Sequence, residues 1–163
     1  MPELNNQNFN HLKIHTQYSI CEGAIKIANL KDFCKEKKIL CLGLSDTSNL
    51  CGALEFAENI SKVGTQPIIG TQIYFRFEDT TGLLPLIALN ENGYKKIIEL
   101  SSRSYLENDA LSDPHLDIKE LLIDTEGVCL LSGTIQGLFG KLFEKGRLEE
   151  ISKLYKSLSS KFK

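Results

Sequence analysis

Apolar runs of strand length alternate with amphipathic stretches along most of the chain. Residues 40–44 are apolar, residues 45–49 are small and polar, and residues 50–63 form an amphipathic stretch. This order is typical of a buried strand that passes through a short loop into a helix. In α/β barrels and open α/β sheets, functional side chains gather at the carboxyl ends of the strands. We therefore expect Asp46 to belong to any active site that this chain contains.

The same periodicities place the other elements. We expect strands at residues 9–15, 67–70, 72–78, 83–89 and 128–132, and helices at 24–38, 50–63, 90–106, 117–123, 138–143 and 148–162. Residues 1–8 are polar and are expected to form a loose tail. Because strands mostly alternate with helices, we expect an α/β fold with mostly parallel strands, as an open sheet or a barrel. The last helix has no glycine or proline stop, so we expect further strands of the same domain outside this chain.

Composition narrows the class of protein. Apolar residues make up 42% of the chain and charged residues 25%, as in a globular domain, and the net charge of −2 disfavours a general nucleic-acid surface. We find neither a membrane-spanning apolar run nor a signal peptide, and we expect a cytoplasmic protein. The five cysteines have no Cys-x-x-Cys spacing, which predicts buried, reduced thiols.

Two groups of polar residues are candidates for chemistry. His11, Lys13 and His15 alternate along the first expected strand and would share one face. Two imidazoles can bind a metal ion, but the ammonium group between them would repel it. Asp46 is either a metal ligand or general base at its strand end, or a cap for the next helix, and the sequence leaves both roles open.

Two further features favour structural roles. Gly133 and Gly137 flank a loop before a helix, which can cradle phosphate, although tight packing of the loop explains both glycines better. His115 lies beside a proline in a polar loop and is expected at the surface.

Five motifs in order resemble a known family. They are HLKIHTQYS at 11–19, LSDTSNLCGALEF at 44–56, PIIG at 67–70, NGY at 92–94 and LLSG at 130–133. From Phe9 to about Leu142 the chain is similar to the N-terminal PHP (polymerase and histidinol phosphatase) domain of bacterial DNA polymerase III alpha subunits. The resemblance implies a distorted (β/α)7 barrel with mostly parallel strands, of which residues 1–163 are the N-terminal, incomplete part. Active members of the family hold several metal ions and hydrolyse phosphoesters with metal-activated water.

The resemblance implies that little of this metal site is kept. His15 and Asp46 match ligand positions, whereas other ligand positions hold residues that suit metal ions poorly: Lys13, Thr47, Gln72, Leu83 and Thr134. We expect a degenerate, vestigial metal site with no catalytic residue. A lysine ammonium can fill the place of a lost metal ion, and we expect Lys13 to pair with Asp46.

The implied function is a structural and interaction domain in DNA replication. The implied partners are the remainder of the polymerase chain, the proofreading exonuclease subunit, and primed DNA through the polymerase. We expect no cofactor here, since magnesium would belong to the polymerase site elsewhere in the longer protein. The alternative is an active phosphoesterase, a 3′–5′ exonuclease or pyrophosphatase, which would use zinc or manganese.

Overall fold

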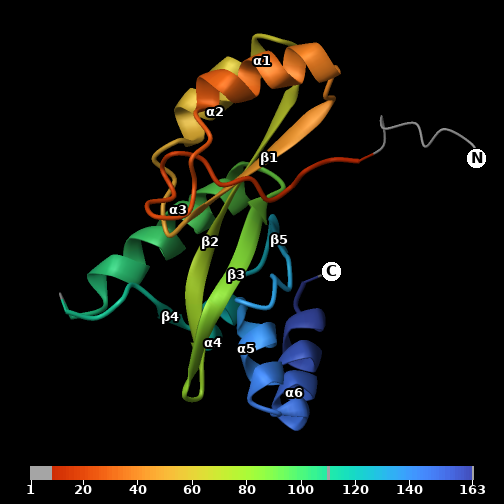
Figure 1. Ribbon diagram of the computed structural model, residues 1–163. Helices are drawn as coiled ribbons and strands as arrows, with labels where there is room; N and C mark the ends of the chain where they lie inside the picture. The colour runs from red at the N-terminus through yellow and green to blue at the C-terminus, as the bar shows by residue number, and fades with distance from the viewer. Residues whose placement is uncertain (1–8, 110, 163) are drawn as a thin grey trace, which may run out of the picture.

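A five-stranded mixed sheet organises the computed structural model, which describes residues 9–109 and 111–162 (Figure 1). The strands are β1 (Cys41–Thr47), β2 (Gln66–Phe77), β3 (Thr80–Ala88), β4 (Leu116–Asp117) and β5 (Val128–Leu130). The helices are α1 (Ile27–Lys37), α2 (Ala53–Ser61), α3 (Glu91–Leu106), α4 (Ile118–Ile123), α5 (Leu138–Glu144) and α6 (Leu148–Ser159). The expected loose tail at 1–8 lies outside the described residues.

The α/β class is confirmed, and the sheet has mixed strand directions. β1 and β4 each pair with β2 in parallel, whereas β2–β3 and β3–β5 are antiparallel. The expectation of mostly parallel strands therefore holds for only part of the sheet. Only Glu78 and Asp79 separate β2 from β3. A connection this short can join only antiparallel neighbours, because a parallel pair needs a long crossover.

β2 is one continuous strand where the sequence predicted two. The prediction ended the first strand at Gly70, but the strand continues from Gln66 to Phe77. A Cβ atom at position 70 would lie 2.4 Å from the carbonyl oxygen of Leu86 on β3. Gly70 therefore permits close approach of two backbones within a strand and does not mark a strand end.

The N-terminal segment lies beside β1 without forming the predicted strand at 9–15. The backbone N–H of Gly43 donates to the carbonyl of His11 (2.7 Å), and that of Ser45 donates to the carbonyl of Ile14 (2.8 Å). In place of a strand, residues 9–15 form one isolated parallel bridge, between Ile14 and Leu44. The segment thus extends the sheet beyond β1 and carries Lys13 and His15 toward the end of that strand.

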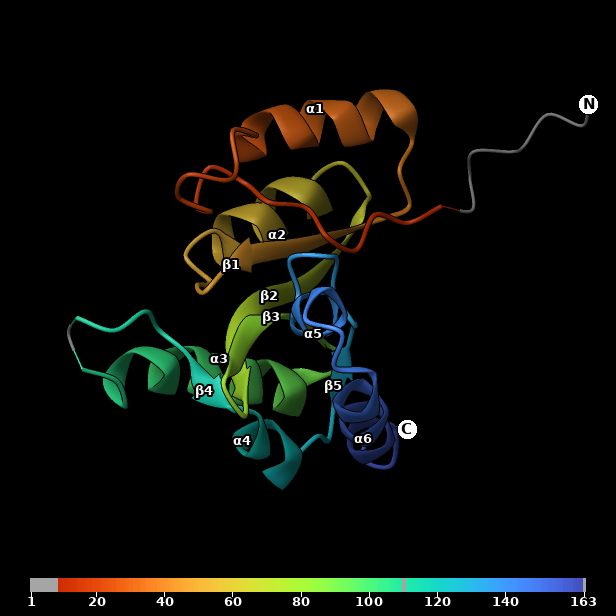
Figure 2. The ribbon, with the colours of Figure 1, turned by 60° about the horizontal axis from the view of Figure 1, so that its bottom comes forward.

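Two hydrophobic clusters hold the helices to the sheet. One joins α1 and α2 to β1, and the other joins α3, α4, α5 and α6 to β2, β3 and β5. Figure 2 shows α1 and α2 on one side of the sheet and α3 and α4 on the other. No helix of the described part of the chain is long and apolar enough to cross a membrane.

The predicted buried faces of the helices are right for α1 and shifted for α2. The sequence pattern puts Ile27, Leu30 and Cys34 on one face of α1, and all three are buried. For α2 the sequence pattern predicts a buried stripe that includes Leu54 and Ile60. Ile60 is buried, together with Ala53 and Phe56, whereas Leu54 is 72% exposed. Ala53, Phe56 and Ile60 follow helical spacings of three and four residues, so this stripe faces the core and Leu54 lies outside it.

The cysteine prediction is correct only in part. All five thiols are free, and Cys34 is buried in α1. Cys21 and Cys51 are exposed and Cys41 and Cys129 are half-buried, so the prediction of buried thiols is wrong for these four. Cys21 and Cys51 lie in connections outside the helices and strands, where no apolar face covers them.

Candidate functional site

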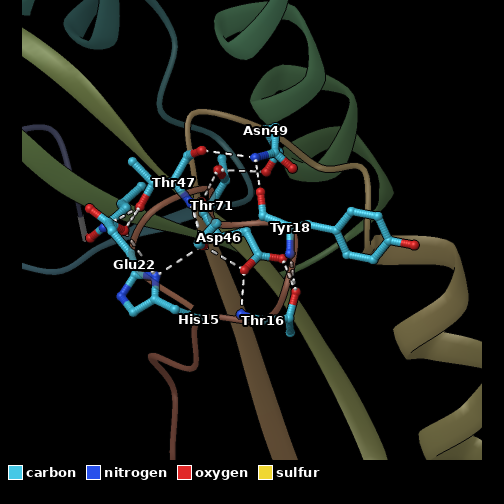
Figure 3. A network of polar contacts seen from close by, with 10 residues as sticks. His15, Thr16, Tyr18, Glu22, Asp46, Thr47, Asn49 and Thr71 are labelled. Carbon is cyan, nitrogen blue, oxygen red and sulfur yellow. Dashed lines mark hydrogen bonds and ion pairs between the residues drawn. The ribbon is translucent and has the colours of Figure 1, made fainter. Parts of the chain in front are cut away.

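The carboxylate of Asp46 is the centre of a buried hydrogen-bond network near the end of β1 (Figure 3). Asp46 is 0% exposed. Its Oδ1 accepts from the backbone N–H of Thr16 (2.6 Å) and from the hydroxyl of Ser19 (2.7 Å), and its Oδ2 accepts from the hydroxyl of Thr16 (2.7 Å). Three donors thus compensate a charge that burial would otherwise make costly. Asp46 ties the loop of residues 16–23 to β1.

Neither Asp46 nor Asn49 caps the next helix. The residue at the N-cap of α2 is Gly52, and no side chain bonds to the cap there. Asn49 accepts from the backbone N–H of Cys51 (3.0 Å) and donates to the carbonyls of Tyr18 and Thr47 (both 2.9 Å). The capping role that the sequence left open is therefore not filled, and the side chains of both residues hold together the loops around β1.

The expected ion pair between Lys13 and Asp46 is absent from the described residues. No carboxylate among them lies within 4.0 Å of the Lys13 ammonium. The physical reason is that Thr16 and Ser19 already surround the Asp46 carboxylate. Lys13 instead faces a neighbouring cavity.

This cavity, of about 190 Å³, brings together residues from distant parts of the chain. Its lining comprises Lys13, His15, Glu22, Gln72, Leu83, Gly133, Thr134, Gln136 and Gly137. Five of these are positions that sequence resemblance assigned to the metal site: Lys13, His15, Gln72, Leu83 and Thr134. Asp46 and Thr47 do not line the cavity, but they connect to it through the 16–23 loop. We call it the strand-end cavity.

Thr47 and Gln72 bond to each other and to the loop. The Thr47 hydroxyl donates to Glu22, and Gln72 Nε2 donates to the Thr47 hydroxyl (2.7 Å). The backbone N–H of Thr47 also donates to the Ser19 hydroxyl (3.1 Å). Two positions that the resemblance assigned to the metal site therefore belong to one chain of hydrogen bonds across β1, β2 and the loop.

His15 lies half-buried beside Glu22 (Figure 3). Its Nδ1 is 3.8 Å from Glu22 Oε2 and 3.4 Å from the Ser19 hydroxyl. Burial lowers the pKa of His15 below 6.5, and the positive charge of Lys13 lowers it further, against the opposing carboxylates of Glu22 and Asp46. The arrangement therefore favours the neutral imidazole near pH 7.

Sequence reasoning missed Glu22. The only signal was its place in the polar loop that follows His15, and no periodicity points a loop side chain toward a site. His11, which was expected to share a face with Lys13 and His15, packs its ring edge-on against Phe9, with 4.7 Å between ring centroids. The irregular backbone of residues 9–15 breaks the alternation that would have aligned all three side chains.

The remaining candidates have structural positions. A Cβ atom at Gly137 would lie 2.9 Å from the carbonyl oxygen of Leu83, which supports the packing interpretation of the loop at 133–137. His115 is half-buried in its loop, with Nδ1 2.8 Å from the carbonyl oxygen of Asp113, and does not line the strand-end cavity.

The donor set fits a multinuclear metal centre poorly. Among residues 9–109 and 111–162, no three His, Cys, Asp or Glu side chains group in a way that could hold a metal ion. Only His15 and Glu22 offer such donors in the lining of the strand-end cavity. Each ion of a multinuclear centre needs several donors, so this set is too small.

Comparison with known proteins identifies the relationship. Residues 11–163 match the family described as the PHP domain. This chain belongs to the PHP domain family. The chain is similar to the DNA polymerase III subunit alpha of Caulobacter vibrioides, at 36% identity over 161 residues, covering 93% of this chain and 14% of that protein. It is also similar to the DNA polymerase III subunit alpha of Borreliella burgdorferi, at 34% identity over 153 residues, covering 87% of this chain and 13% of that protein.

The match to this PHP domain confirms the resemblance carried by the five sequence motifs. The chain spans about one seventh of the length of the curated relatives it matches. A solved structure of an amidohydrolase from Chromobacterium violaceum superposes with a TM-score of 0.49 at 15% identity, over 60% of this chain and 33% of that one.

Proposed function

We propose that this chain is the N-terminal PHP region of a bacterial replicative DNA polymerase alpha subunit, acting as a structural and interaction domain. The 36% identity over 93% of the chain to a DNA polymerase III alpha subunit supports this parentage. In this proposal, nucleotide addition, contact with primed DNA and the magnesium ions belong to the remainder of the polymerase chain, in the cytoplasm.

The PHP site has no catalytic role in this proposal. The single observation that carries this inference is that its polar groups already bond to one another. Asp46 accepts three hydrogen bonds from Thr16 and Ser19, and Thr47 bonds to both Glu22 and Gln72. A metal ion would have to displace these hydrogen bonds. In their present arrangement, the bonds hold the 16–23 loop against β1 and β2.

The family resemblance also supports docking of the proofreading exonuclease subunit on this domain. A test is co-elution of the full alpha subunit with the exonuclease subunit in gel filtration, beside a variant that lacks residues 1–163. We expect co-elution of the full subunit and its loss in the shortened variant. Equal co-elution of both forms would contradict this docking.

A second candidate is an active PHP phosphoesterase, acting as a 3′–5′ exonuclease or pyrophosphatase with zinc or manganese. It is favoured by His15 and Glu22, whose Nδ1 and Oε2 lie 3.8 Å apart at the strand-end cavity. Hydrolysis measurements distinguish the two candidates. The substrates are p-nitrophenyl phosphate, pyrophosphate and a 3′-labelled oligonucleotide, each with manganese or zinc.

We expect no metal-dependent hydrolysis above buffer for the wild type, since two donors cannot assemble the metal centre. His15→Ala should give the same rates, as should the control His115→Ala, whose imidazole does not line the cavity. Hydrolysis by the wild type that His15→Ala abolishes and His115→Ala leaves intact would favour the phosphoesterase and overturn the non-catalytic role.

A further inference from the structure

The orientation of the Gln72 amide follows from the bonds of Thr47. The carboxylate of Glu22 can only accept, so the single hydroxyl proton of Thr47 is donated to Glu22. Thr47 must then accept from Gln72, which presents Nε2 to it at 2.7 Å. The other end of the amide, Oε1, is left for a different partner.

That remaining oxygen is buried and unsatisfied. Gln72 is 2% exposed, and its Oε1 has no hydrogen-bond partner among the residues that the structure describes. A buried acceptor without a donor lowers the free energy of unfolding, so a donor near this oxygen would stabilise the fold. Gln72 lines the strand-end cavity, and Glu22, a second acceptor, lines the same cavity.

Lys13 is the cation in this lining. Lys13 contributes to the cavity from the N-terminal segment, and Gln72 contributes from β2. Its ammonium has three donors on a flexible stem, which suits two acceptors in different directions. A cavity of about 190 Å³ has room for a few waters, at roughly 30 Å³ each. Such waters can bridge the Lys13 ammonium to Gln72 Oε1 and to the Glu22 carboxylate, with neither of which it forms a direct bond.

We propose that the ammonium of Lys13 takes the place of a metal ion in the strand-end cavity. There it stabilises the charge of the Glu22 carboxylate and supplies the donor that Gln72 Oε1 lacks. This inference rests on the proposed non-catalytic role of the site. It replaces the expected partner Asp46 with Gln72, which the resemblance had assigned to the same site, and with Glu22, which sequence reasoning missed. The charge of one lysine then does locally what a divalent ion does in metal-binding members: it stabilises acceptors gathered at the strand ends.

Thermal unfolding of the purified chain tests this role. Lys13→Met keeps the length of the side chain and removes its charge, Lys13→Arg keeps the charge, and Lys35→Met is the control at an exposed lysine of α1. We expect Lys13→Met to lower the Tm by about 2–4 °C, the range for loss of one such interaction in a chain of this size. Lys13→Arg and Lys35→Met should stay within about 1 °C of the wild type.

A double variant tests the partner. If the Lys13 ammonium compensates the charge of Glu22, the double variant Lys13→Met/Glu22→Gln should recover part of the Tm that Lys13→Met loses. The reason is that the carboxylate left without a cation is then also removed. The same double variant decides the matter if Lys13→Met does not fold: recovered folding supports the proposal, and no recovery overturns it.

Other results would also overturn the inference. An unchanged Tm in Lys13→Met, or a loss equal to that of Lys35→Met, would show that Lys13 is an ordinary surface lysine. These outcomes are separate from those of the hydrolysis measurements. A wild type that hydrolyses phosphoesters contradicts the proposed function whatever the Tm values are, whereas an inert wild type with an unchanged Lys13→Met contradicts only the role of Lys13.

Discussion

At the scale of single residues, His15 and Asp46 show how different the surroundings are of two positions that the family resemblance assigned to a metal site. Asp46 is fully buried and accepts three hydrogen bonds, so its lone pairs are directed at protein donors. His15 remains at the cavity, near Glu22 and Ser19. The family motif identified both residues, but it could not show that Asp46 is enclosed by the loop that follows His15.

The pKa of His15 gives a pH-dependent prediction. Burial first, and then the charge of Lys13, lowers this pKa in the folded chain below the ordinary value of 6.5. As pH falls from 6.5 through the lowered pKa, the unfolded chain binds the proton more readily, so the free energy of unfolding decreases. Above pH 6.5 the neutral imidazole contributes its full stability.

An NMR titration of the His15 ring in the wild type should therefore give a midpoint below 6.5. In Lys13→Met the midpoint should rise, and in Glu22→Gln it should fall further, because the first change removes a positive charge and the second a negative one. Denaturant unfolding should show a decline in stability below pH 6.5 that is smaller in His15→Gln. A wild-type midpoint at or above 6.5 would contradict the burial of His15 beside Lys13.

At the scale of elements, hydrophobic periodicity located the helices well and the strands less well. The buried face of α1 and the apolar runs of β1 and β3 are strong local signals. The two-residue strand β4 is too short to have a period, and its pairing with β2 depends on tertiary contacts. The antiparallel hairpin of β2 and β3 follows from the short turn between them, which the sequence pattern left between the strands expected at 72–78 and 83–89.

The tie between the 16–23 loop and β1 can be measured by substitution of Asp46. Asp46→Ala leaves buried donors of Thr16 and Ser19 without an acceptor, and we expect it to destabilise the fold by about 3 kcal/mol. Asp46→Asn should lose less, about 1–2 kcal/mol, because one amide oxygen still accepts. The measurement is denaturant unfolding monitored by circular dichroism.

Asp32→Ala is the matched control for this series, since Asp32 is exposed on α1 and should change stability by no more than about 0.5 kcal/mol. If Asp46→Ala were as mild as Asp32→Ala, the carboxylate would not be the tie that its three hydrogen bonds indicate.

At the scale of the whole molecule, the fold assembles one cavity from residues far apart in the sequence. Lys13, Gln72, Leu83 and Thr134 come from the N-terminal segment, β2, β3 and the loop before α5. Periodicity alone could not predict this assembly, because it depends on how the strands pair. The resemblance assigned the positions to one site, but not Glu22, whose placement depends on the conformation of its loop.

The most direct test of the central claim, that a family metal site is now a polar scaffold, is calorimetric titration of the metal-free chain with zinc and with manganese. We predict no tight, stoichiometric uptake of two or more ions, in the wild type or in His15→Ala. Tight uptake of two or more ions per chain by the wild type, lost in His15→Ala, would contradict the claim.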